Sequence, residues 1–125
     1  AVIRPHAGGL DREVFWTLCL DAKQGLKGSP ETITSGVLDA SLVHPREVFS
    51  GAIRAAAASV VVVHNHPSGD PTPSSEDLRI TRQLVEAGRI LDIRVLDHVI
   101  IGRACEGRAE DYVSLRESGL VKFEA

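Results

Sequence analysis

The stretch "VVVVHNHPSGDPTPSSEDL", residues 60–78, shapes the expected fold more than any other part of the chain. Its four consecutive valines predict a strand that is buried on both faces, as at the centre of a sheet. The strand ends in His64 and His66, and a loop with three prolines and Gly69 follows. The serines and acids at 74–77 are typical of the start of a helix. The stretch therefore predicts a strand–loop–helix unit of an α/β domain.

The flanking sequence supplies the remaining elements. Strands are predicted over residues 13–21, 32–38 and 93–102, helices over 44–59 and 74–91, and a short strand with a terminal turn over 112–120. The inner helix faces are expected to hold Val48, Ala52, Ile53 and Ala56 in the first helix and Leu78, Leu84, Val85 and Leu91 in the second. The order β-β-α-β-α-β-β predicts a single α/β domain with a mixed sheet over residues 1–125.

Composition limits the function classes. The 125 residues are 43% hydrophobic, which suits one domain with a real core, and no apolar run approaches the ~20 residues of a membrane-spanning helix. A net charge of −3 gives no electrostatic reason to expect tight nucleic-acid binding. Cys19 and Cys105 form no C-x-x-C pair, which favours two ordinary thiols in a reducing, cytoplasmic setting. Residues 1–9 are expected to be a flexible N-terminal segment, and the missing initiator methionine suggests a processed chain or an excised domain.

The two histidines and a later acid have the spacing of a metal site. On a strand, residues i and i+2 point to the same face, so His64 and His66 should project together. The loop turns the chain back, which lets Asp77 in the first helical turn return to the strand end. Two imidazoles and one carboxylate suit Zn²⁺, one ion per chain, with an open fourth position as in catalytic zinc sites. The simpler alternative is that Ser74 and Asp77 only cap the helix, as an S-x-x-D start often does.

The same residues resemble a known family. "HNHPSGDPTPSSEDL" is similar to the signature of RadC-type members of the JAMM/MPN metalloprotease superfamily, H-x-H-x(7)-S-x-x-D with a distal glutamate. "LDASLVHPREVF" and "RVLDHVIIG" resemble RadC as well. The resemblance implies the JAMM/MPN fold, a curved mixed sheet flanked by helices, in a general architecture shared with the cytidine-deaminase-like enzymes. It also implies zinc-dependent cleavage of amide or isopeptide bonds. RadC proteins usually carry an N-terminal helix-hairpin-helix-like region, and its absence from this chain supports an excised domain.

The resemblance also suggests roles for further residues. Glu13, at the start of the first strand, matches the distal glutamate that serves as general base. Glu47, in the first turn of a helix, is the competing candidate. Ser74 is expected to donate a hydrogen bond to the oxyanion of the tetrahedral intermediate. Asp97 and His98 lie on opposite faces of one strand, so at most one of them can support the metal site.

Three functions remain to be compared. The first is a zinc hydrolase acting on a protein or peptide. The second is a non-catalytic MPN module that binds protein or nucleic-acid partners, and the complete set of ligands and base weighs against it. The third is an enzyme acting on nucleic acid, suggested by the historic association of the family with DNA repair. The acidic charge and the few aromatic residues weaken it. A zinc deaminase would need H-x-E and P-C-x-x-C motifs, which the sequence lacks.

Overall fold

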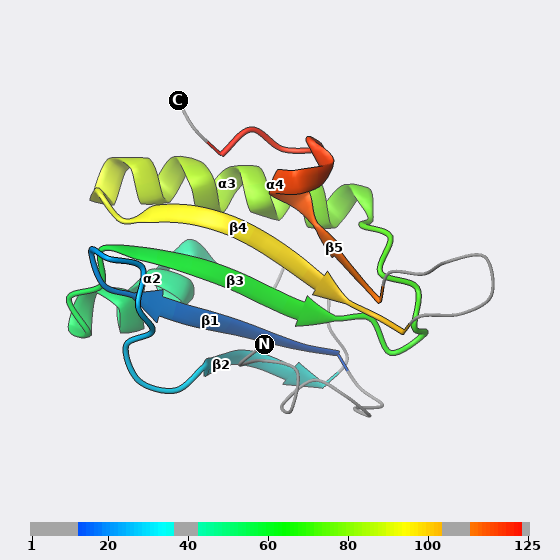
Figure 1. Ribbon diagram of the computed structural model, residues 1–125, viewed down its shortest axis with the longest axis horizontal. Coiled ribbons are helices and arrows are strands. Elements are labelled where there is room, and N and C mark those ends of the chain that lie inside the picture. Colours follow the sequence, from blue (N-terminus) through cyan, green and yellow to red (C-terminus); the bar gives the residue numbers. More distant parts are fainter. Residues whose placement is uncertain (1–12, 37–42, 104–110, 124–125) are drawn as a thin grey trace.

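The computed structural model describes residues 13–36, 43–103 and 111–123, so the expected flexible segment 1–9 lies outside the described residues. Strands and helices alternate along the chain much as predicted (Figure 1). The elements are β1 (Glu13–Leu20), β2 (Glu31–Gly36), α2 (Pro45–Arg54), β3 (Ser59–Asn65), α3 (Ser75–Leu91), β4 (Arg94–Ile101), β5 (Tyr112–Ser114) and α4 (Leu115–Ser118).

The strands form one mixed sheet in the order β2-β1-β3-β4-β5. The valine-rich strand β3 is central, antiparallel to β1 and parallel to β4. Helix α3 makes the crossover that a parallel pair of strands requires. The prediction of one small α/β domain with a mixed sheet is therefore confirmed, and its topology fits the JAMM/MPN fold.

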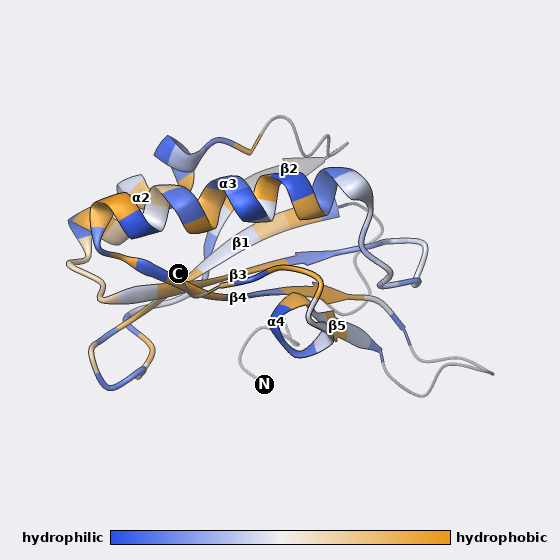
Figure 2. Cartoon of the chain, turned by 90° about the horizontal axis from the view of Figure 1, so that it is seen from above, coloured by the Kyte–Doolittle hydropathy of each residue, from blue (hydrophilic) through white to orange (hydrophobic). Residues whose placement is uncertain are grey.

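Both faces of the central strands are buried, which explains their unbroken apolar sequence. Helices α2 and α3 lie on the same face of the sheet (Figure 2). The core on that side includes Phe15 of β1, Val62 of β3 and Leu84 of α3. A smaller cluster around Trp16 and Val63 is buried on the opposite face. Strands of this kind cannot alternate apolar and polar residues, because neither face meets water.

The predicted end of helix α2 and part of its predicted inner face were wrong. Helix α2 ends at Arg54, not near residue 59, because Ala56 adopts a left-handed backbone with φ +53°. The alanine run favours a helix by propensity, but the chain leaves the helix here and turns toward β3, where the backbone N–H of Ala58 donates to the carbonyl of Leu20 at 2.9 Å. Ile53, predicted to face inward, is 57% exposed.

The inner face of α3 also differs from the prediction. Leu91 is 44% exposed, whereas the buried positions are Asp77, Ile80, Thr81, Leu84 and Gly88. The buried face thus includes two polar residues and a glycine, which a search for apolar periodicity passes over. None of the helices in the described parts of the chain is both long and apolar enough to span a membrane.

The topology brings the ends of three elements together at one end of the sheet. Strand β3 finishes there, and β1, antiparallel to it, begins there. Helix α3 starts after the loop that follows β3. Residues from the start of β1, the end of β3 and the first turn of α3 are therefore neighbours at this end of the sheet (Figure 1).

Candidate metal centre

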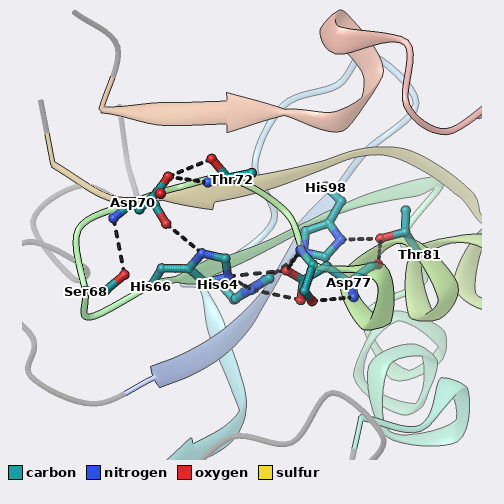
Figure 3. Close-up of polar contacts among 9 residues, drawn as sticks. His64, His66, Ser68, Asp70, Thr72, Asp77, Thr81 and His98 are labelled. Carbon is teal, nitrogen blue, oxygen red and sulfur yellow. Dashed lines mark hydrogen bonds and ion pairs between the residues drawn. The ribbon is translucent and has the colours of Figure 1, made fainter. Parts of the chain in front are cut away.

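His64 and His66 stand together at the end of β3. The backbone N–H of His66 donates to the carbonyl of Ile101 at 2.8 Å, so the ladder with β4 extends to this residue. The two imidazoles therefore share one face, and their Nε2 atoms are 3.0 Å apart (Figure 3). Asn65, between them, points elsewhere and accepts a 2.7 Å hydrogen bond from the backbone N–H of Val14. The structure thus shows the i, i+2 arrangement that the sequence predicted.

The loop after His66 is held in a fixed shape. The Asp70 carboxylate accepts hydrogen bonds from the backbone N–H and the hydroxyl of Thr72 at 3.0 and 2.7 Å. Arg103 donates from its guanidinium to the carbonyls of Pro67 and Ser68. These contacts explain how a proline- and glycine-rich segment can return the chain to the strand end with a defined geometry.

Asp77 completes the cluster from the first turn of α3. Its Oδ1 lies 3.4 Å from Nε2 of His64, and its Oδ2 lies 3.3 Å from Nε2 of His66 (Figure 3). One ligand atom from each of the three residues falls within 4.8 Å of the others. The structure therefore brings together the three residues predicted to bind a metal.

The hydrogen bonds around the cluster fit a cation. Nδ1 of His66 lies 2.9 Å from the carbonyl oxygen of Asp70, which can only accept, so this nitrogen carries a proton, and in the neutral ring Nε2 is left as an acceptor. Nδ1 of His64 is likewise occupied, at 2.8 Å from Nε2 of His98. Lone pairs of the two Nε2 atoms and of the Asp77 carboxylate thus converge on one point. Such an arrangement can hold a metal ion, which fits the JAMM metal site.

The pKa values of the cluster residues also fit the binding of a cation. Burial alone would raise the pKa of the Asp77 carboxyl, but hydrogen bonds with His64, His66 and the backbone of Ser74 outweigh it and hold this pKa well below its usual range. Burial lowers the pKa of His66, yet its bonds to Asp77 and to the Asp70 carbonyl more than compensate, and the pKa is raised. The carboxylate is therefore charged and favours positive charge beside it.

Glu13 lies at the same end of the sheet as this cluster. It is the first residue of β1, where Phe15 pairs across the sheet with His64. Burial raises the pKa of the Glu13 carboxyl, and the charges of His64 and His66 oppose that rise. A half-buried carboxyl with a raised pKa is suited to proton transfer. The competing candidate, Glu47, lies half-buried in the first turn of α2. The choice of Glu13 as base stays a prediction.

Ser74 is the N-cap of α3. Its hydroxyl oxygen accepts from the backbone N–H of Asp77 at 3.0 Å, and the Asp77 carboxylate accepts from the backbone N–H of Ser74 at 2.8 Å. This is a complete capping box, as the simpler alternative expected. The capping box is compatible with metal binding, because the same Asp77 carboxylate also faces both histidines. The role of the Ser74 hydroxyl in catalysis stays a prediction.

The structure separates Asp97 from His98. The carboxylate of Asp97 faces away from the cluster and accepts hydrogen bonds from the Ser114 hydroxyl and the backbone N–H of Arg116. His98 is fully buried and contacts His64 directly. Burial and the nearby charge of His64 hold the pKa of His98 well below its usual range, so its ring is neutral at neutral pH.

Sequence reasoning missed one polar residue behind the cluster. Thr81 is completely buried, and its hydroxyl contacts both Nδ1 of His98 and the backbone carbonyl of Asp77. No motif marks this threonine. Its spacing of four residues from Asp77 places the two on the same helix face, which was the only signal available.

Comparisons with known proteins agree with this site. The family model for the RadC-like JAB domain matches residues 1–120. The UPF0758 protein of Methanosarcina barkeri is 52% identical over 111 residues, covering 89% of this chain and 45% of the relative. The UPF0758 protein of Caldanaerobacter subterraneus subsp. tengcongensis is 53% identical over 115 residues, covering 92% and 46%. The chain spans about half the length of the curated relatives it matches. With this match over nearly its whole length, and with the His64, His66 and Asp77 cluster in place, the chain belongs to the family of RadC-like JAB domains.

Proposed function

We propose that this domain is a zinc-dependent hydrolase that cleaves an amide or isopeptide bond in a protein or peptide. The convergence of His64, His66 and Asp77, with their acceptor atoms within 4.8 Å of one another, carries the proposal. Two imidazoles and one carboxylate are the ligand set of several catalytic zinc sites. Because the chain spans about half the length of its curated relatives, the proposal concerns this domain alone.

The residues around the ligands supply the other parts of such a reaction. Zinc, when bound, supplies the Lewis acidity that makes water a nucleophile near neutral pH. Glu13 takes the proton of the attacking water and passes it to the leaving amine. The raised pKa of the Glu13 carboxyl supports this role, since a stronger base accepts the proton more readily. Ser74 donates its hydroxyl proton to the developing oxyanion, because its oxygen lone pair already serves as the helix cap.

A purely binding module is the weaker candidate. Loss of a ligand or of the base is the simplest route to an inactive scaffold, and this domain retains all of them. Binding to nucleic acid has no support from the net charge of −3.

The test combines metal content with turnover. We expect the purified chain to bind about one zinc ion, measured by elemental analysis, and to cleave members of a panel of quenched-fluorescent peptides and isopeptide-linked peptides. His64→Ala should lose the stoichiometric metal. Glu13→Gln should keep the zinc and lose turnover by ~100-fold to ~10,000-fold, because a general base has been removed.

Glu47→Gln is the matched control, since it removes the competing carboxylate and should leave both zinc and turnover unchanged. Unaltered zinc content in His64→Ala would refute the ligand assignment. An inactive Glu47→Gln beside a fully active Glu13→Gln would move the role of base to the helix. A zinc-loaded chain that cleaves no member of the panel would count against hydrolysis of peptides.

A further inference from the structure

A buried row of hydrogen bonds runs behind the cluster from one ligand to another. Nδ1 of His64 lies 2.8 Å from Nε2 of His98, and Nδ1 of His98 lies 2.5 Å from the hydroxyl of Thr81. That hydroxyl donates to the backbone carbonyl of Asp77 at 2.6 Å. The side chains come from β3, β4 and α3, and their residues are 1%, 0% and 0% exposed (Figure 3). Water therefore has little access to the row.

The direction of every proton in this row follows from its last acceptor. A backbone carbonyl can only accept, so Thr81 must use its one hydroxyl proton there. The Thr81 oxygen can then only accept from His98, which places the His98 proton on Nδ1. A neutral imidazole has one donor and one acceptor, so Nε2 of His98 must accept the proton of His64 Nδ1. His64 is left with a bare Nε2 that faces His66 and Asp77.

The two histidine ligands obtain this orientation in different ways. Nδ1 of His66 donates directly to the carbonyl of Asp70, and a carbonyl can only accept. The partner of His64 is another imidazole, which could donate as readily as it accepts. If His98 carried its proton on Nε2, it would donate to His64, and the His64 proton would move to the nitrogen that faces the metal. His98 alone therefore cannot set the tautomer of His64, and Thr81 is needed.

We propose that His98 and Thr81 are positioning residues that fix His64 in the tautomer with a bare Nε2 and thereby set the metal affinity of the site. Neither residue contacts the three ligand atoms that would hold the ion. Partners of this kind behind a metal ligand typically change affinity by ~10-fold to ~100-fold when removed. The inference rests on the proposed metal site, but it makes a separate statement about the metal-free protein.

The test uses a matched pair of substitutions at one position. Thr81→Val keeps the shape of the side chain and removes the hydroxyl, whereas Thr81→Ser keeps the hydroxyl. We expect zinc affinity, measured by competition with a chromophoric chelator, to fall by ~10-fold to ~100-fold in Thr81→Val and to stay within about threefold in Thr81→Ser. His98→Phe, which preserves a buried ring without an acceptor, should weaken binding to a similar degree.

A second measurement separates proton ordering from a general loss of structure. In the metal-free chain, the ¹⁵N shifts of the His64 ring should show the proton on Nδ1 in the natural protein and in Thr81→Ser. A mixture of tautomers is expected in Thr81→Val. An unchanged His64 tautomer with natural zinc affinity in Thr81→Val would overturn the inference. Failure of the natural chain to bind zinc would instead refute the proposed metal site, while the ring shifts would still decide whether the row orders its protons.

Discussion

At the scale of single residues, Ser74 offers a test of two simultaneous roles. Its oxygen accepts the cap hydrogen bond from the backbone of Asp77, so its proton is available to a substrate oxygen. Ser74→Ala should therefore lower the free energy of unfolding by about 1 kcal/mol, the usual contribution of an N-cap. It should also reduce turnover by ~100-fold to ~1,000-fold with zinc retained, because an oxyanion donor is lost.

Ser74→Asn is the matched control for this position. Asparagine caps helices well but would not place a donor at the same point, so stability should recover while turnover does not. A thermal melt and a turnover assay on both variants are sufficient. Near-normal turnover in Ser74→Ala would leave this serine with a capping role only.

The sequence was informative about residues that act through spacing and uninformative about residues that act through tertiary contact. His64, His66 and Asp77 could be grouped because the strand period and a turning loop bring them together. His98 and Thr81 could not be assigned, because their roles depend on the register of β3 against β4, in which Val62 lies opposite His98. The spacing of residues in the sequence also does not predict which atom donates in each hydrogen bond among His64, His98 and Thr81.

At the scale of elements, Gly88 shows where α3 meets the sheet. A Cβ at this position would lie 2.4 Å from the carbonyl oxygen of Ile93 and 3.2 Å from the Phe49 ring. Alanine is favoured over glycine by about 1 kcal/mol within a helix, but here it would push the helix away from β4. We expect Gly88→Ala to lower the free energy of unfolding by about 1–3 kcal/mol, measured by urea denaturation.

Asp92→Gly tests the same helix end without adding volume. Asp92 ends α3 with a left-handed backbone at φ +59°, a conformation that glycine adopts without steric cost. This variant should therefore be at least as stable as the natural chain. A Gly88→Ala protein that matches or exceeds natural stability would show that α3 can shift on the sheet more freely than the contacts indicate.

The element scale also shows which part of the fold could be predicted. Order, type and approximate bounds of the strands followed from apolar and β-branched runs, because burial on both faces imposes that composition. The end of α2 did not follow, since local propensity extends the helix through the alanines whereas a backbone hydrogen bond from Ala58 to Leu20 turns the chain. Helix ends that depend on contacts between distant residues cannot be predicted from local sequence.

At the scale of the whole molecule, the buried His98 and the partly buried His66 should give the metal-free chain a stability maximum near pH 6.5. The pKa of His98 is lowered from 6.5 in the folded chain. As pH falls below this value, His98 is protonated in the unfolded chain but not in the folded chain, so stability is lost. The pKa of His66 is raised from 6.5, so its contribution is full below this value and is lost as pH rises through the folded pKa. Stability therefore rises with pH below about 6.5 because of His98 and falls with pH above it because of His66.

Bound zinc should reverse the dependence of stability on pH above about pH 6.5. Metal ligands must be unprotonated, so zinc affinity and the stability it confers both grow as pH rises. We expect the melting temperature of the chelator-treated chain to fall as pH rises above about 6.5, and that of the zinc-loaded chain to rise over the same range. His66→Asn should remove both trends, because it deletes the group that titrates and one of the ligands. A metal-free chain that keeps gaining stability as pH rises above about 6.5 would contradict the raised pKa of His66 and, with it, the charged pairing between His66 and Asp77.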